Sequence, residues 1–221
     1  MKKLLAIIFG LMSLSVFAQT NGRQLAPGAM ENFNALLNKS GFAQATTATA
    51  LGKGWFRLDS DVHIFTDEVS IGQVAGVLLD LENMPKYFQG KKNRAEATVV
   101  QRGDDEVIMD FVSINPVLAF QIKTPYRASL KVLENSETSV CMEVSQLAAD
   151  SQANNSIRNL FISRYACEVI IGDKTYTYIR FVIQNEINTS ILPGARGVLE
   201  KNSDSANVEA QQLLIKAAKT K

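Results

Sequence analysis

The sequence predicts an α+β fold in which a curved antiparallel sheet of about six or seven strands wraps around a long C-terminal helix. Two patterns carry this prediction. A series of segments rich in β-branched and aromatic residues, joined by short polar turns, follows one amphipathic helical segment. The chain then closes with a second, longer helical pattern. A sheet and a helix that each carry one apolar face bury both faces when they pack together.

The first 18 residues have the composition of a cleaved secretory signal peptide. Lys2 and Lys3 precede an almost wholly apolar stretch that ends at Ala18. This order of a basic and an apolar region is typical of exported bacterial proteins. We expect cleavage near Ala18 and a mature protein that is periplasmic or secreted. No later segment has the roughly 18 consecutive apolar residues of a membrane-spanning helix.

The net charge argues against nucleic acid as a partner. Without Lys2 and Lys3 the chain carries 21 Lys and Arg residues against 22 Asp and Glu residues, a formal net charge of −1. A protein with this balance has no general attraction for a polyanion. The remaining length suits one domain with a substantial core. We expect an N-terminal arm over residues 19–54, with one short helix at 29–38, and a single domain over residues 55–221.

The segment from Ser60 to Gly90 contains a strand followed by an amphipathic helix. Residues 61–66 alternate as in a half-buried strand. Beyond Ser70, which with Asp67 is a candidate N-cap, apolar residues recur at helical spacing, and Pro85 marks the end of the pattern. The predicted buried stripe consists of Ile71, Val74, Val77, Leu78 and Leu81.

The strand-rich part of the chain follows this helix. The predicted strands cover residues 95–101, 106–114, 120–133, 139–146, 157–171 and 175–187. The short turns between them imply antiparallel neighbours. In residues 120–132 alternate side chains are apolar or small, so one face of this strand is dry and the other is wet. The closing helix covers about residues 198–219, with an apolar face of Leu199, Ala206, Ala210, Leu213 and Ala217.

The residues from Val74 to Phe88 resemble the helix-and-turn signature of a known family. They combine an apolar helix, Asp80, and a Pro-aromatic turn at Pro85 and Tyr87. Over about residues 56–218 the chain is similar to the START-related, helix-grip superfamily of lipid-transfer, polyketide-cyclase and pollen-allergen-like proteins. The resemblance implies a helix-grip fold whose sheet and last helix enclose an apolar tunnel for a lipid, sterol, quinone or aromatic ligand.

The candidate ligand-binding residues are large side chains at inward positions and at the helix-turn segment. The candidates at the mouth are Met84, Pro85, Tyr87, Phe88 and the loop at 191–193, and those in the cavity are Phe111, Phe120, Ile122, Tyr126, Leu130, Met142, Tyr165, Phe181, Ile183 and Leu213. Small inward residues such as Thr124 and Ala128 favour some empty space, although close packing uses such residues equally well. A ligand-sized cavity and a filled core both stay open.

An acidic ligand in an apolar cavity needs a polar anchor, and an inward arginine can supply it. Arg127 and Arg180 fall on the wet sides of their strands, while Arg164 alternates ambiguously with its apolar neighbours. The sequence therefore does not single out an anchor. Asp80 is expected at the surface rather than as a buried partner of Arg127.

The sequence contains no nucleophile elbow, phosphate-binding loop or dinucleotide fingerprint. His63 is the only histidine, and its position opposite Val62 and Ile64 predicts a surface or structural role on the outer face of its strand. Cys141 and Cys167 are predicted to be free thiols on opposite faces of the sheet. We expect no cofactor and no metal.

Three functions fit these observations. The first is an exported, non-enzymatic carrier or sensor that holds a hydrophobic small molecule or lipid, such as a fatty acid or quinone, and contacts membranes transiently. The second is a cyclase- or hydrolase-type enzyme in which Tyr126, Tyr165 or Arg164 orients an aromatic or acyl substrate. The single histidine and the unpaired carboxylates count against it. The third is a protein-interaction module with a filled core.

Overall fold

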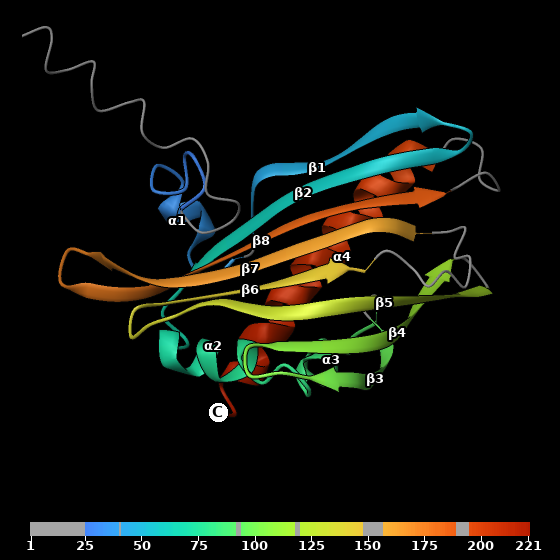
Figure 1. The fold of residues 1–221 in the computed structure, drawn as a ribbon. Helices are drawn as coiled ribbons and strands as arrows, with labels where there is room; N and C mark the ends of the chain where they lie inside the picture. Colours follow the sequence, from blue (N-terminus) through green and yellow to red (C-terminus); the bar gives the residue numbers. More distant parts are fainter. Residues whose placement is uncertain (1–24, 40, 92–93, 118–119, 148–156, 189–194) are drawn as a thin grey trace, which may run out of the picture.

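Eight antiparallel strands form one curved sheet that wraps around helix α4 (Ala195–Ala218) (Figure 1). The computed structural model describes residues 25–39, 41–91, 94–117, 120–147, 157–188 and 195–221. The predicted signal peptide and the loop at 191–193 lie outside the described residues. The strands pair in the order β1-β2-β8-β7-β6-β5-β4-β3. The predicted α+β architecture is confirmed.

Seven of the eight strands, β2 to β8, correspond to segments that the sequence predicts. The bounds are β1 (Gly41–Gly52), β2 (Trp55–Thr66), β3 (Ala95–Arg102), β4 (Glu106–Val117), β5 (Phe120–Asn135), β6 (Ser139–Gln146), β7 (Ile157–Ile171) and β8 (Lys174–Asn188). Turn residues connect most of them, and each neighbouring pair is antiparallel.

Strand β1 is the element that the sequence did not predict. Its residues were expected in the N-terminal arm, whereas they pair with β2 and form an edge of the sheet. Residues 43–50 consist only of Ala, Gln and Thr, so they show no apolar alternation. The turn between β1 and β2 has a sequence, Gly52-Lys53-Gly54, that is typical of a hairpin turn. Gly52, Lys53 and Gly54 all have positive φ angles, of 85°, 51° and 76°, a conformation that glycine favours and that hairpin turns require.

Helix α1 (Phe33–Leu36) is shorter than the helix predicted at 29–38, because the residues before it form turns. The segment covers the outer face of the sheet. The Phe33 ring lies edge-on to Phe65, with ring centroids 5.1 Å apart. The backbone N–H of Ala26 donates a hydrogen bond of 2.9 Å to the Tyr178 hydroxyl. The sheet is therefore buried on both faces over part of its area.

Helix α2 (Ile71–Leu78) has the predicted cap and the predicted buried stripe. The Ser70 hydroxyl oxygen accepts a hydrogen bond of 3.3 Å from the backbone N–H of Gln73, and the Gln73 side-chain oxygen accepts one of 2.9 Å from the backbone N–H of Ser70. This reciprocal pair is a capping box. The five stripe residues are all buried in the principal core, the larger hydrophobic cluster, which lies between the inner face of the sheet and the helices. The one-turn helix α3 (Met84–Tyr87) follows and has Pro85 in its first turn.

The stripe of α4 that faces the sheet shares Ala210 with the predicted one and differs from it at most other positions. Its buried residues are Asn207, Ala210, Gln211, Leu214, Ile215 and Ala218. Leu213 and Ala217 are only partly buried. The polar Gln211 lies inside because its side-chain amide donates to the carbonyl oxygens of Val62 at 2.9 Å and Ile179 at 3.4 Å. A hydropathy pattern does not reveal a buried amide whose nitrogen donates to backbone carbonyls, while its oxygen has no partner among the described residues.

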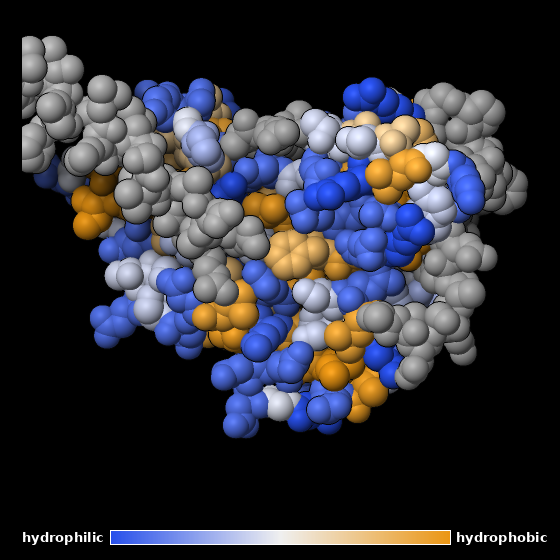
Figure 2. All heavy atoms as spheres, turned by 45° about the horizontal axis from the view of Figure 1, so that its top comes forward, coloured by the Kyte–Doolittle hydropathy of each residue, from blue (hydrophilic) through white to orange (hydrophobic). Residues whose placement is uncertain are grey.

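The exterior is mixed in character. Figure 2 shows hydrophilic side chains interspersed with smaller hydrophobic patches. The most exposed large apolar residues are spread over separate parts of the chain and are Leu25, Met30, Leu51, Val100, Ile170 and Val198. Isolated exposed apolar residues of this kind are normal in folded proteins. None of the helices in the described ranges is long and apolar enough to cross a membrane.

Replacing Ser70 by Ala is expected to lower the free energy of unfolding by about 1 kcal/mol, because it removes the acceptor for a backbone N–H at the start of α2. Urea denaturation followed by circular dichroism measures the change. Ser70→Thr keeps a hydroxyl acceptor and should lose much less stability. Equal losses in the two variants would contradict the cap as the cause.

Candidate ligand-binding site

Most of the predicted site residues meet on the inner face of the sheet, in the principal core that α2, α3 and α4 cover. Those buried in this core are Met84, Phe88, Phe111, Leu130, Met142 and Phe181. Those that are partly buried against it are Tyr87, Tyr126 and Ile183. The side chains of Phe120 and Ile122 lie outside the described part of the chain. The rings of Phe111 and Tyr126 stack with centroids 5.1 Å apart.

Two predicted residues lie elsewhere. Tyr165 belongs to a second cluster, on the outer face of the sheet. Its neighbour Ala166 is the residue of β7 that faces the principal core, so strand alternation turns Tyr165 outward. Leu213 is partly exposed because α4 presents Leu214 to the core instead.

The outer cluster also corrects the predicted placement of the cysteines. Cys141 pairs in register with Tyr165, and Cys167 lies two residues further along β7 on the same side as Tyr165. Both cysteines pack in the outer cluster, so they share one face rather than lying on opposite faces. Neither cysteine forms a disulfide bond.

His63 lies on the outer side of β2, as predicted, but it is 1% exposed rather than at the surface. Its ring lies against Tyr178, with centroids 5.9 Å apart. Burial lowers the pKa of His63, which favours the neutral imidazole at neutral pH. Among the residues that the structure describes, no group of three or more His, Cys, Asp and Glu side chains is placed to hold a metal ion.

Arg164 brings a positive charge into the principal core. On β7 it pairs in register with Met142 on one side and Phe181 on the other; since both are core residues, Arg164 points to the inner face. Its Nη1 lies 2.6 Å from the Met84 sulfur and 3.8 Å from the Met142 sulfur. Its guanidinium carbon lies 4.1 Å from the Phe88 ring centroid and 5.5 Å from that of Phe181, within the range of cation–π attraction.

The surroundings of Arg164 are mainly apolar. Burial lowers the pKa of Arg164 to about 10, so the guanidinium stays charged at neutral pH. Its Nε has no hydrogen-bond partner among the described residues, and thioether sulfurs are weak acceptors. Tyr126 lies close enough to interact electrostatically with Arg164, and burial raises its pKa to about 12. The inner face therefore holds two protonated donors in an apolar setting.

Several inner-face residues keep accessible surface although protein surrounds them. Arg164 and Tyr126 are enclosed by protein atoms, yet both remain partly accessible. Ile162 and Ile183, on the inner side of β7 and β8, are also only partly buried. These four inner-face side chains are therefore not completely covered by the helices.

Asp80 fastens the helix-turn segment. Its carboxylate accepts a hydrogen bond of 2.5 Å from the Tyr87 hydroxyl and one of 3.1 Å from the Lys221 ammonium. Burial alone would raise the pKa of Asp80, but the donors, with Tyr87 first, lower it. Asp80 thus joins the end of α2, helix α3 and the last residue of the chain. Arg127 pairs with Asp110, 2.7 Å away, and not with Asp80.

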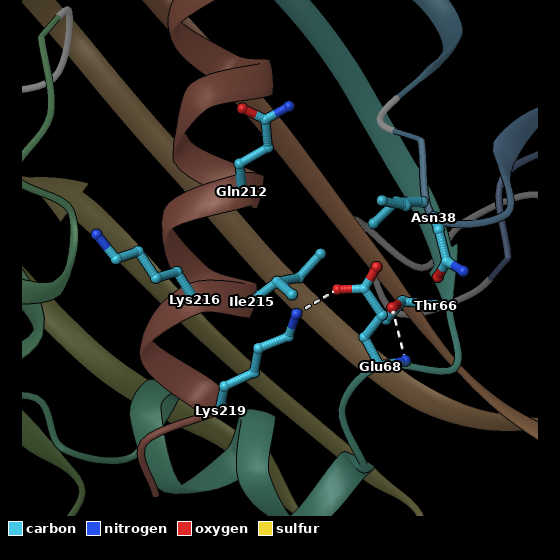
Figure 3. A pocket seen from close by; sticks show the side chains of 8 residues that line it. Asn38, Thr66, Glu68, Gln212, Ile215, Lys216 and Lys219 are labelled. Carbon is cyan, nitrogen blue, oxygen red and sulfur yellow. Dashed lines mark hydrogen bonds and ion pairs between the residues drawn. The ribbon is translucent and has the colours of Figure 1, made fainter.

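A separate pocket of about 230 Å³ lies near the C-terminal end of α4 (Figure 3). It is lined by Asn38, Ile64, Thr66, Glu68, Gln212, Ile215, Lys216 and Lys219. The ammonium of Lys219 lies 2.5 Å from the Glu68 carboxylate. The lining combines six polar or charged residues with Ile64 and Ile215. It contains none of the predicted site residues.

Replacing Asp80 by Asn is expected to reduce the loss of stability in acid. A carboxylate whose pKa lies below its ordinary value of 3.8 stabilises the fold above that pH, and the contribution is lost as the pH falls through the folded-state pKa. The Tm of the wild type should therefore fall more steeply below about pH 4 than that of Asp80→Asn.

Calorimetry between about pH 3 and pH 7 measures this difference. Asp104→Asn, in an exposed turn, controls for the removal of one carboxylate. If the Tm of the wild type and that of Asp80→Asn fell equally as the pH was lowered, the role of Asp80 would be contradicted.

No family model matches the chain, and no curated protein matches it. Solved structures do match. Human STARD10 is similar with a TM-score of 0.51 and 12% identity, over 90% of this chain and 80% of that one. TTHA0849 from Thermus thermophilus is similar with a TM-score of 0.51 and 12% identity, over 72% of this chain and 96% of that one. The chain therefore shares its fold, a curved antiparallel sheet around a long C-terminal helix, with these two structures, and the predicted helix-grip architecture is confirmed.

Proposed function

We propose that the protein binds a hydrophobic small molecule or lipid between the inner face of the sheet and helices α2, α3 and α4, and acts as a carrier or sensor. The observation that carries this proposal is that apolar and aromatic residues on the inner face, such as Tyr126, Ile162 and Ile183, are only partly buried. A ligand that covers this surface gains about 25 cal/mol for each Å² of apolar area removed from water. The helix-grip fold agrees with such a ligand site.

The entrance that fits this function is the segment from Met84 to Phe88. Helix α3 is a single turn, and one side of it is held by the Asp80 hydrogen bonds. The Phe88 ring covers the guanidinium of Arg164. Movement of this short segment would uncover the inner space, and transient contact of the same segment with a membrane would let an apolar ligand pass without crossing water.

Organic extraction of protein purified from its native host, followed by mass spectrometry, should release a lipid or quinone in a stoichiometric amount. Ile183→Trp places a larger ring on the inner face and should reduce the bound amount severalfold. Val100→Trp, at a position of β3 that is 47% exposed, should bind as the wild type does. A folded wild-type protein that yields no ligand would contradict the carrier function and favour a protein-interaction module with a filled core.

The same ligand separates a carrier from an enzyme. After long incubation with the protein, a carried ligand should return with unchanged mass. Of the residues proposed to orient a substrate, Tyr126 and Arg164 share the inner face, whereas Tyr165 lies on the outer face. Conversion that disappears in Tyr126→Phe would assign the site to catalysis instead.

We also propose, from the sequence of the predicted signal peptide alone, that the protein is exported and is periplasmic or secreted. Fractionation of bacterial cells should find the mature protein outside the cytoplasm, and N-terminal sequencing should place its first residue near Gln19. Changing Lys2 and Lys3 to Glu should slow export, because the basic region of a leader is needed for its recognition. A wild-type protein that keeps Met1 and stays in the cytoplasm would contradict this proposal.

A further inference from the structure

Arg164 differs from the other arginines of the described chain in its partners. Six of them form ion pairs with carboxylates, namely Arg57, Arg102, Arg127, Arg158, Arg180 and Arg196. Arg164 forms none with any described residue. It contacts two sulfur atoms and two aromatic rings instead. A positive charge thus sits on the inner face without a counter-charge.

Such an arrangement opposes folding. The guanidinium keeps only partial access to solvent, so it loses part of its hydration, and this loss opposes folding unless an anion or several hydrogen bonds replace it. Aromatic faces and thioether sulfurs replace only part of it. The guanidinium also stays protonated at neutral pH, so it does not avoid this cost by becoming neutral. A group that destabilises its own fold in this way is explained by a ligand that supplies the missing compensation.

The contacts of Arg164 also orient it. Its guanidinium lies over the Phe88 ring, and its Nη1 contacts the sulfurs of Met84 and Met142. The Nε donor has no hydrogen-bond partner among the described residues, and both hydrogen bonds of the guanidinium to described residues use Nη1. Two donors on one edge of a guanidinium match the two oxygens of a carboxylate or phosphate. Tyr126 adds a protonated hydroxyl to the same space.

We propose that Arg164 anchors the anionic head group, a carboxylate or a phosphate, of a long-chain amphiphile whose chain lies along the apolar part of the inner face. The inference rests on the proposed function and names the class of ligand for that site. Phe111, Phe181 and Ile183 supply apolar contact for the chain, and the Arg164 fork binds the head.

The test compares three probes that share one alkyl chain and differ in the head group: palmitate, hexadecanol and hexadecyl phosphate. Calorimetric titration of delipidated protein measures each affinity. The wild type should bind at least one of the anions about tenfold to a hundredfold more tightly than hexadecanol, the range expected for hydrogen bonds to a charged group. The stronger of the two anions identifies a carboxylate or a phosphate as the head group.

Arg164→Met should remove this preference and keep the affinity for hexadecanol within about threefold, since Met preserves apolar contact. Arg127→Met removes the same charge from the outer side of β5, where Arg127 pairs with Asp110, and should keep the preference. Equal binding of all three probes by the wild type would overturn the anchor and leave the carrier function standing. A wild type that binds none of them and yields no extracted ligand would overturn both.

The stability of the ligand-free protein gives a second readout. Arg164→Met should have a Tm equal to or above that of the wild type, because it removes an uncompensated charge. A clear fall in Tm, together with an unchanged ratio of palmitate to hexadecanol affinity, would assign Arg164 a structural stacking role and overturn the proposal.

Discussion

The concave face of the sheet has to be covered, and the way that α4 covers it determines the rest of the structure. Helix α4 packs mainly on β1, β2 and β8 and on α2, while α2 reaches β6 and β7. Gln211 ties α4 closely to the strands through the carbonyl oxygens of Val62 and Ile179. Because α4 is held toward one side of the sheet, the short helix α3 and long side chains close the other side. That is where Arg164 and Tyr126 lie.

Strand register keeps the charge in this position. On β7 the inward residues are Ile162, Arg164 and Ala166, and Tyr165 faces the opposite side. A shift of one residue would exchange the two sets. The outer cluster, which the N-terminal segment covers, buries Tyr165 and Cys141 and so opposes such a shift. The packing of the outer face thereby helps to fix the composition of the inner face.

The parts of the fold that followed from the sequence are those with one buried face. Helix α2 has a wet side, so its stripe and its Ser70 cap were readable from spacing. Strand β7 is covered on both faces, so Tyr165 gave no signal of its direction. Gln211 is polar and buried, so the predicted apolar face of α4 omitted it and included Leu213, which is only partly buried. Pattern analysis fails where a polar side chain is buried or where both faces of a strand are apolar.

A filled core and a ligand site make different demands on Arg164. Close packing alone is served at least as well by Met or Leu, because replacing an enclosed charge by an apolar side chain of similar volume is commonly neutral or stabilising. Tyr126 and Ile183 on the same face also keep some accessible surface, which an apolar ligand would cover. A ligand with an anionic head and an apolar chain accounts for the unpaired charge and for the open surface together. A ligand site thus explains the charge of Arg164 and the accessible surface beside it by one cause, whereas a filled core needs a separate cause for each.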